Sequence, residues 1–239
     1  MALPPISYPH GADLPTDVVQ LGPDLDDDSI SRLIGPVDGK RVLDLGCGAG
    51  AASIALARRG ARVIAVESST ARLAQARTAA ELAEVHIEFH HSDLADLAFL
   101  RADSVELVVA VYSLAGVGDL GRVFRQLHRV LRPEAPVVLS FPHPFATMLE
   151  LDPEEQQTPY LTRTYWSENP LAWRAGGDEG ITHVHQIGDV FTHLHRSNFR
   201  VDGIVEPIAE VDSGRSLHRS DLARWVPTTL IVRGRKQGI

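Results

Sequence analysis

Residues 42–53, VLDLGCGAGAAS, hold the residue types and spacing that most clearly suit ligand chemistry. An apolar run leads directly into glycines, and helix-forming residues follow. Gly46 permits a tight turn, and Gly48 lets the backbone approach a ligand without a Cβ atom in the way. Gly50 or Ala51 lets the next helix pack close to the strand, and the start of that helix leaves N–H groups free for ligand atoms. The segment predicts a cofactor loop, but Gly46, Gly48 and Ala51 also satisfy the dinucleotide pattern G-x-G-x-x-G/A.

Two acidic residues follow this loop at positions that suit a nucleoside. Glu67 ends the second apolar run, about 20 residues on, where an acid accepts hydrogen bonds from ribose hydroxyls. Asp93 follows the third apolar run within HSDLADL, residues 91–97. A carboxylate there is placed to accept from an adenine amino group. Glu67 suits a nicotinamide cofactor equally well, so these two residues alone do not identify the cofactor.

The elements that must position these residues alternate along the chain. The predicted strands are 40–46, 61–67, 85–91, 105–114, 136–141, 199–207 and 228–235, and the predicted helices are 24–34, 50–59, 69–82, 119–131 and 189–197. Strand and helix in alternation indicate an α/β fold with a mainly parallel sheet and helices on both faces. Parallel strands are buried on both sides, which suits the apolar runs at 61–67 and 105–114, whereas 85–91 alternates apolar and polar residues.

With these pieces in order, the chain resembles the class I S-adenosylmethionine-dependent methyltransferases, especially the small-molecule, methyltransferase type 11 branch. The matching pieces are LDLGCGAG at 43–50, VIAVESS at 63–69, HSDLADL at 91–97 and FRQLHRVLRP at 124–133. The resemblance implies a Rossmann-like, seven-stranded, mostly parallel sheet with an antiparallel last strand. It also implies S-adenosylmethionine as cofactor and methyl transfer (EC 2.1.1.-) to a small-molecule acceptor.

The resemblance also implies a role for each matching residue. The methionine part of the cofactor would contact the loop from Asp44 to Gly50, the ribose would contact Glu67, the adenine would contact Asp93 and the Leu94 backbone, and Tyr112 would flank the cofactor. The full predicted cofactor set is Asp44, Gly46, Cys47, Gly48, Gly50, Glu67, Ser68, Asp93, Leu94 and Tyr112. The chain departs from the family at Gly116, where many relatives carry a histidine. Any role of that histidine cannot be transferred.

The 239 residues are expected to form a single domain with four parts. Residues 1–34 are predicted as an arm and helix, 35–141 as the cofactor-binding core, 142–188 as a lid inserted after the fifth strand, and 189–239 as a C-terminal helix and strands. Within the lid, a hairpin is expected from TRTYW, 162–166, and ITHVHQI, 181–187. The predicted acceptor-binding residues are Tyr8, His10, His143, Tyr165, Trp166, Trp173 and His183.

His143 is the predicted general base. It follows the fifth strand directly, at the carboxyl edge where open α/β sheets bind ligands. Imidazole suits proton abstraction near neutral pH, and a hydroxyl acceptor often needs a base, whereas an amine needs only a neutral lone pair. His183 and His185 would share one face of a strand, but no matching cysteine or carboxylate set accompanies them, so no metal site is expected.

Composition narrows the remaining function classes. The formal net charge of −8 and a sequence pI near 5.7 do not favour nucleic acid as a partner. Cys47 is the single cysteine, and no apolar run approaches the roughly 20 residues of a membrane helix, so a cytoplasmic protein is expected. The chain has no phosphate-binding G-x-x-x-x-G-K-[ST] loop and no Tyr-x-x-x-Lys pair. The alternatives are a non-catalytic S-adenosylmethionine-binding protein and, less favoured, an NAD-dependent oxidoreductase.

Overall fold

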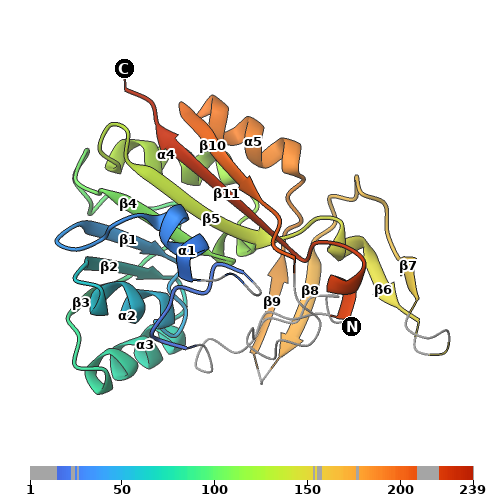
Figure 1. Ribbon diagram of the computed structural model, residues 1–239, viewed down its shortest axis with the longest axis horizontal. Coiled ribbons are helices and arrows are strands. Elements are labelled where there is room, and N and C mark those ends of the chain that lie inside the picture. Colours follow the sequence, from blue (N-terminus) through green and yellow to red (C-terminus); the bar gives the residue numbers. More distant parts are fainter. Residues whose placement is uncertain are drawn as a thin grey trace.

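The computed structural model describes residues 15–22, 25, 27–152, 154, 158–175, 178–208 and 221–238. A seven-stranded sheet runs through it in the order β10-β11-β5-β4-β1-β2-β3 (Figure 1). The strands are β1 (Arg41–Leu45), β2 (Arg62–Glu67), β3 (Ile87–His91), β4 (Leu107–Val111), β5 (Pro136–Pro142), β10 (Phe199–Val205) and β11 (Thr229–Lys236). β1 to β5 pair in parallel, and β11 is antiparallel to both β5 and β10. The predicted fold class is confirmed.

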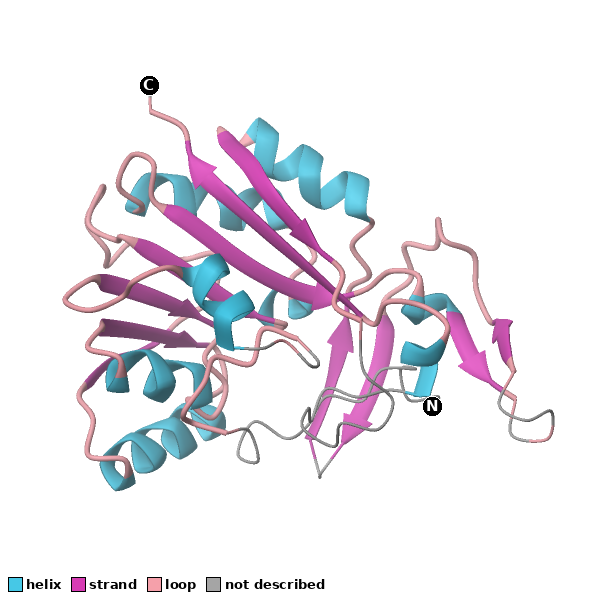
Figure 2. Ribbon diagram, viewed as in Figure 1, coloured by secondary structure: helices cyan, strands magenta, loops and turns pink. Residues whose placement is uncertain are grey.

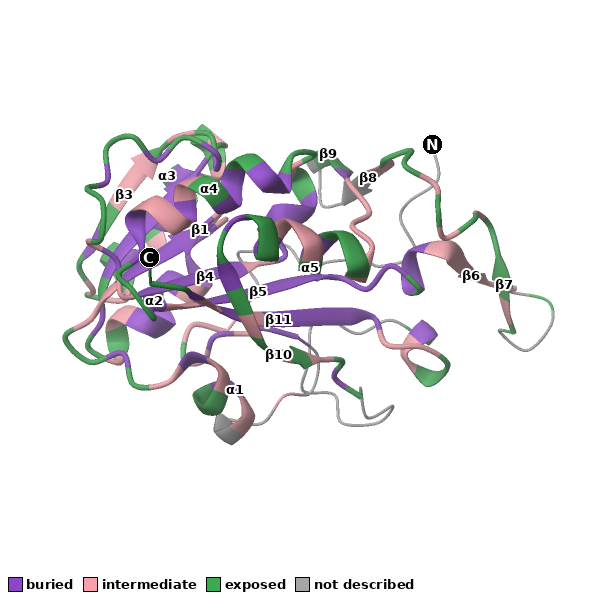
Figure 3. Ribbon diagram, turned by 90° about the horizontal axis from the view of Figure 1, so that it is seen from above, coloured by how far each residue is buried: buried purple, intermediate pink, exposed green. Residues whose placement is uncertain are grey.

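Helices cover both faces of this sheet (Figure 2). They are α1 (Asp27–Ile34), α2 (Ala51–Arg58), α3 (Thr70–Leu82), α4 (Leu120–Val130) and α5 (Ile187–Arg196), with 3₁₀ turns η2 (Ser113–Gly116), η3 (Ala146–Met148) and η4 (Asp221–Arg224). α4 and α5 contribute to one apolar cluster, and α1, α2 and α3 contribute to a second. Figure 3 shows α4 and α5 above the sheet and α1 below it. The sheet therefore has two buried faces, as the apolar strands require.

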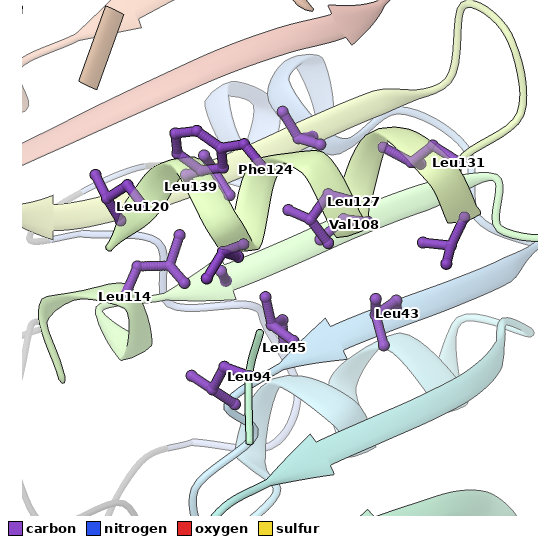
Figure 4. Packing of buried hydrophobic residues seen from close by; sticks show 14 of the residues in the cluster. Leu43, Leu45, Leu94, Val108, Leu114, Leu120, Phe124, Leu127, Leu131 and Leu139 are labelled. Carbon is purple, nitrogen blue, oxygen red and sulfur yellow. The ribbon is translucent and has the colours of Figure 1, made fainter. Parts of the chain in front are cut away.

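The core on the α4 side follows from helical periodicity. Leu120, Phe124, Leu127 and Leu131 recur three or four residues apart and are almost fully buried. They pack over strand residues such as Leu43, Val108 and Leu139 (Figure 4). Asp119 caps the start of α4, because its Oδ1 accepts the N–H of Arg122 at 2.9 Å. This bond satisfies one of the free N–H groups in the first turn of the helix.

The chain between β5 and α5 leaves the main sheet. It forms two antiparallel hairpins, β6 (Leu149–Leu151) with β7 (Pro159–Leu161) and β8 (Leu171–Ala175) with β9 (Asp178–Thr182). Both lie beyond the carboxyl ends of the parallel strands (Figure 1).

The predicted hairpin between 162–166 and 181–187 is wrong. Arg163 gathers residues 163–169 into a loop, because its Nη2 donates to Ser167 O and Asn169 O at 2.9 and 2.6 Å. The partner of β9 is instead 171–175, and residues 183–186 form the connection to α5.

We expect Leu127→Ala to lower the free energy of unfolding by about 2–5 kcal/mol, because it leaves a cavity under α4. Leu82→Ala removes the same atoms from a side chain that is 82% exposed at the end of α3. That control should change the unfolding free energy by about 0.5 kcal/mol or less. Urea unfolding followed by circular dichroism measures both variants, and equal losses would contradict the packing of α4.

Candidate functional site

The glycine loop is fixed between β1 and α2 by the end of β2. The N–H groups of Gly46 and Cys47 both donate to the carbonyl oxygen of Val66, at 2.8 and 3.0 Å. Gly46 has φ +79°, and a Cβ there would overlap the side chain of Ser113. Gly50 has φ +92° at the start of α2. The sequence needs glycine at 46 for two reasons, the left-handed backbone and the close approach of Ser113.

Glu67, at the end of β2, ties the loop to the next turn. Its side chain is buried, and its Oε2 accepts the N–H of Gly48 at 2.9 Å while Oε1 accepts the N–H of Ser69 at 2.8 Å. Ser68 Oγ also donates to Oε1, at 3.4 Å. A carboxylate has about four lone-pair sites, so these three bonds still leave acceptor capacity for a ligand hydroxyl. Ser68, beside it, is exposed, and its carbonyl oxygen lies 2.9 Å from His91 Nε2.

Asp44 places a second buried carboxyl beneath the loop. Ser53 Oγ of α2 donates to its Oδ2 at 2.5 Å. Burial raises the pKa of Asp44 to about 6 against the lowering effect of the Ser53 hydrogen bond, and the charge of Glu67 raises it further. Two nearby carboxyls under one loop make a site that favours a cation. Burial also raises the pKa of the Cys47 thiol, so Cys47 stays protonated and is no nucleophile.

Asp93 lies exposed after β3. Its Oδ1 accepts the N–H of Ala95 at 2.7 Å, which shapes the turn that follows the strand. Leu94 is buried, and its Cδ1 would lie 3.3 Å from a Cβ at Gly46. The turn after β3 therefore reaches the glycine loop. The predicted adenine contact of Asp93 remains a prediction.

Tyr112 ends the strand run at β4 in a left-handed conformation, with φ +55°. Its hydroxyl lies 2.6 Å from Thr229 Oγ1 at the start of β11, and burial raises the pKa of this phenol, so it stays neutral. Strained backbone of this kind is often found at functional sites. Next to it, Ser113 Oγ donates to Leu45 O at 2.5 Å, so η2 is held against the beginning of the glycine loop.

His143, the predicted base, is buried, and both of its ring nitrogens are in use. Nδ1 accepts the N–H of Phe145 at 3.2 Å, and Nε2 donates to Glu206 Oε1 at 2.9 Å. Burial lowers the pKa of His143, while the hydrogen bond and charge of Glu206 raise it. A neutral imidazole in this arrangement has no free lone pair, so His143 would have to release Phe145 before it could accept a proton. Its catalytic role remains a prediction.

Several of the predicted acceptor residues lie on the insert with uneven exposure. Tyr165 packs against Phe145 with ring centroids 5.4 Å apart and against Trp166 at 5.1 Å, and Trp166 is 77% exposed. His183 is half-buried after β9. Trp173 pairs with Gly180 through the β8–β9 register, and its side chain is not described. Tyr8 and His10 lie outside the described residues.

Sequence reasoning missed several residues that shape this edge. Ser113, Phe145, Glu206 and Thr229 each contact a predicted site residue. Glu206 is 63 residues from His143 and Thr229 is 117 from Tyr112, so spacing carried no signal for them. Phe145 lies two residues after His143, and its aromatic type was the one available clue.

Together these features define a class of protein. A glycine loop joins the first parallel strand to its helix, acidic residues end the second strand and follow the third, and the last strand of the seven is antiparallel. This is the arrangement of the class I S-adenosylmethionine-dependent methyltransferases.

The comparisons with known proteins agree. Residues 42–134 match the methyltransferase domain family. An S-adenosylmethionine dependent methyltransferase from Mesorhizobium loti is 28% identical, with a TM-score of 0.71 over 86% of this chain and 94% of its own. A Listeria monocytogenes chain reaches 0.73 at 17% identity over 87% of this chain and 95% of its own, which shows the fold alone. The cofactor of this family is S-adenosylmethionine.

Curated relatives match the cofactor-binding part. A ubiquinone biosynthesis O-methyltransferase from Hahella chejuensis is 35% identical over 102 residues, 43% of each chain. A demethylmenaquinone methyltransferase from Clavibacter sepedonicus is 37% identical over 110 residues, 46% of this chain and 44% of its own. The chain therefore spans less than half the length of these relatives.

No helix in the described part combines the length and apolar content that a membrane span requires. Nor do three His, Cys, Asp or Glu side chains of the described residues gather in a way that could hold a metal ion.

Gly46 and Gly48 offer a matched pair for testing the loop. Both have positive φ, but a Cβ at Gly48 would meet no atom within 4 Å. We expect Gly48→Ala to cost about 1–2 kcal/mol of stability, from backbone strain alone. Gly46→Ala should cost clearly more stability, because its Cβ also overlaps Ser113. Adding Ser113→Gly to Gly46→Ala should recover part of that extra loss. Urea unfolding measures all three, and equal losses at 46 and 48 would refute the close approach of η2.

Proposed function

We propose that this protein binds S-adenosylmethionine at the glycine loop and transfers its methyl group to a small-molecule acceptor, most simply a hydroxyl compound. The observation that carries the proposal is the loop itself. It combines open space at Gly48 with two buried carboxyls, Asp44 and Glu67, beneath it. S-adenosylmethionine carries a sulfonium and an ammonium group, and either cation would offset the burial and the Glu67 charge that raise the pKa of Asp44.

The cofactor contacts that we propose follow the elements. Asp44, Gly46, Cys47, Gly48 and Gly50 would hold the methionine part, since they surround the start of α2. Glu67 would accept from the ribose with its remaining lone pairs, with Ser68 beside it. Asp93 and the Leu94 backbone would hold the adenine after β3, and Tyr112 would flank the cofactor at the end of β4.

The proposed acceptor site lies on the insert side of the loop. Residues 142–188 would act as a lid, with Phe145, Tyr165 and Trp166 as an apolar wall at the end of β5. Small-molecule sites are mostly apolar with a few polar groups. The Hahella chejuensis relative is named as an O-methyltransferase of ubiquinone biosynthesis, and this name supports a ring hydroxyl as acceptor.

One contribution of the chain to the chemistry would be alignment. The cofactor supplies an activated methyl group when it is bound. The loop would fix the donor, and the insert would fix the acceptor oxygen in line with the methyl carbon, which makes the reaction effectively unimolecular. Closure of the insert would exclude water that competes for the methyl group.

The test of this function separates binding from transfer. Thermal unfolding should shift upward with S-adenosylmethionine or S-adenosylhomocysteine and should not shift with NADH. Ligand at 100 times its Kd adds about 2.7 kcal/mol of stability. Radiolabelled methyl groups should then appear in one member of a panel of phenols, catechols and hydroquinones. Binding of S-adenosylhomocysteine without transfer to any acceptor would favour a non-catalytic binding protein, and a shift with NADH alone would overturn the proposal.

Asp44 should make cofactor affinity depend on pH. The pKa of this carboxyl is about 6 in the free protein, and a bound cation would lower it. Binding then releases a proton below pH 6, so affinity should rise by up to about tenfold per pH unit between pH 5 and 6 and level off above pH 7. Asp44→Asn should lose this slope, whereas Asp189→Asn on exposed α5 should keep it. Calorimetry from pH 5 to 8 measures the slope, and an unchanged slope in Asp44→Asn would place the titrating group elsewhere.

A further inference from the structure

Three histidines reach the carboxyl edge near η2 and the end of β5, and they differ in what their ring nitrogens do. His143 uses Nδ1 for Phe145 and Nε2 for Glu206. His185 turns inward, with Nε2 3.3 Å from Leu114 O and its ring edge-on to Phe141. Neither ring nitrogen of His183 has a hydrogen-bond partner among the described residues. His183 is therefore the one of the three whose lone pair is available.

The backbone holds His183 close to the glycine loop. Its N–H donates to Ala115 O at 2.7 Å, and Ala115 lies in η2. At the other side of η2, Ser113 Oγ donates to Leu45 O, directly before Gly46. Two hydrogen bonds and one 3₁₀ turn thus separate His183 from the loop that would hold the cofactor.

Glycine makes room for the imidazole ring. A Cβ at Gly118 would lie 3.2 Å from His183 Cε1, which is tighter than an ordinary contact. Gly118 has no positive φ, so backbone conformation does not demand glycine there. The ring is half-buried, and it lies against the connection between η2 and α4.

The order of the strands places this ring on the acceptor side. Glu67 ends β2 and Asp93 follows β3, so the nucleoside would lie over the β1-β2-β3 half of the sheet. The methyl group would then face the opposite half, above β4 and β5. η2 follows β4, and the segment after β9 is hydrogen-bonded to η2 through the N–H of His183 and Ala115 O.

We propose that His183 is the general base of the methyl transfer, an inference that rests on the proposed function with a hydroxyl acceptor. The free imidazole nitrogen takes the hydroxyl proton while the acceptor oxygen forms its bond to the methyl carbon. The electron pair of the broken carbon–sulfur bond stays on sulfur. The imidazolium then releases its proton to solvent, which returns His183 to its neutral form. The insert thereby supplies the polar group as well as the wall of the acceptor site.

A crystal structure with S-adenosylhomocysteine tests the placement without any acceptor. A direct base lies about 3 Å from the acceptor oxygen, which lies about 3 Å from the methyl carbon. A ring nitrogen of His183 should therefore lie within roughly 8 Å of the sulfur. A larger distance, with η2 and the insert ordered, would overturn the inference whatever the activity of the protein.

Kinetics test the role. With catechol as acceptor, His183→Ala should lower kcat by about 10²–10⁴, with S-adenosylhomocysteine affinity and circular dichroism unchanged. Added imidazole should restore part of the rate. With 4-nitrocatechol, which is already ionised at the assay pH, the defect should nearly disappear. Gly118→Ala, which keeps the imidazole but displaces it, should show a smaller loss.

The matched control is His86→Ala, because His86 is exposed before β3 and far from this edge in the sheet order. It should leave kcat unchanged. Equal losses with catechol and 4-nitrocatechol, or no response to imidazole, would show that His183 is structural and refute the base. Failure of the wild type to methylate any phenol would count against the proposed function, and the sulfur distance would still decide the placement of His183.

Discussion

The Glu67 carboxylate accepts two backbone N–H groups, from Gly48 and Ser69, and the cofactor edge depends on this interaction. Val66, the residue before it, accepts two more from Gly46 and Cys47. The end of β2 therefore fixes the path of the loop that follows β1. Because a buried carboxylate is costly unless it is hydrogen-bonded, these donors also explain how Glu67 is kept inside the protein. The negative charge of Glu67, together with burial, disfavours ionisation of Asp44. A positively charged ligand group beside the loop would offset this effect.

The insert is joined to this loop through η2 rather than through the sheet. Ser113 holds η2 to the end of β1, and Ala115 holds the segment that follows β9. The left-handed backbone of Tyr112 turns the chain out of β4 to make η2 possible. One 3₁₀ turn thus connects the part of the chain that matches the methyltransferase domain family to the insert that follows it.

Much of the fold was readable from the sequence because most strands of the parallel sheet are short apolar runs between helices, and β3 alternates apolar and polar residues. The glycine loop was readable because Gly46 and Gly50 are needed for their positive φ. The strand predicted over 105–114 ends early, at Val111, because Tyr112 has a left-handed backbone. No residue pattern in the sequence predicts that conformation at a tyrosine. The hairpins of the insert were misassigned because the hydrogen bonds of Arg163 make a loop from residues whose types suit a strand.

The histidines show why position alone does not assign a catalytic group. His143 was favoured because it follows β5 at the edge where ligands bind, and that placement is correct. What decides proton transfer is the lone pair, and Phe145 and Glu206 occupy both nitrogens of this ring. The pair with Glu206 joins the end of β5 to the residue after β10, so its effect is to hold two strand ends together. His183 lies farther along the chain and donates its backbone N–H to Ala115, and its ring nitrogens have no hydrogen-bond partner in the described part of the chain. The hydrogen-bond partners of the two rings, rather than their distance from a strand end, are the reason that we propose His183 as the base, while the role of His143 remains a prediction.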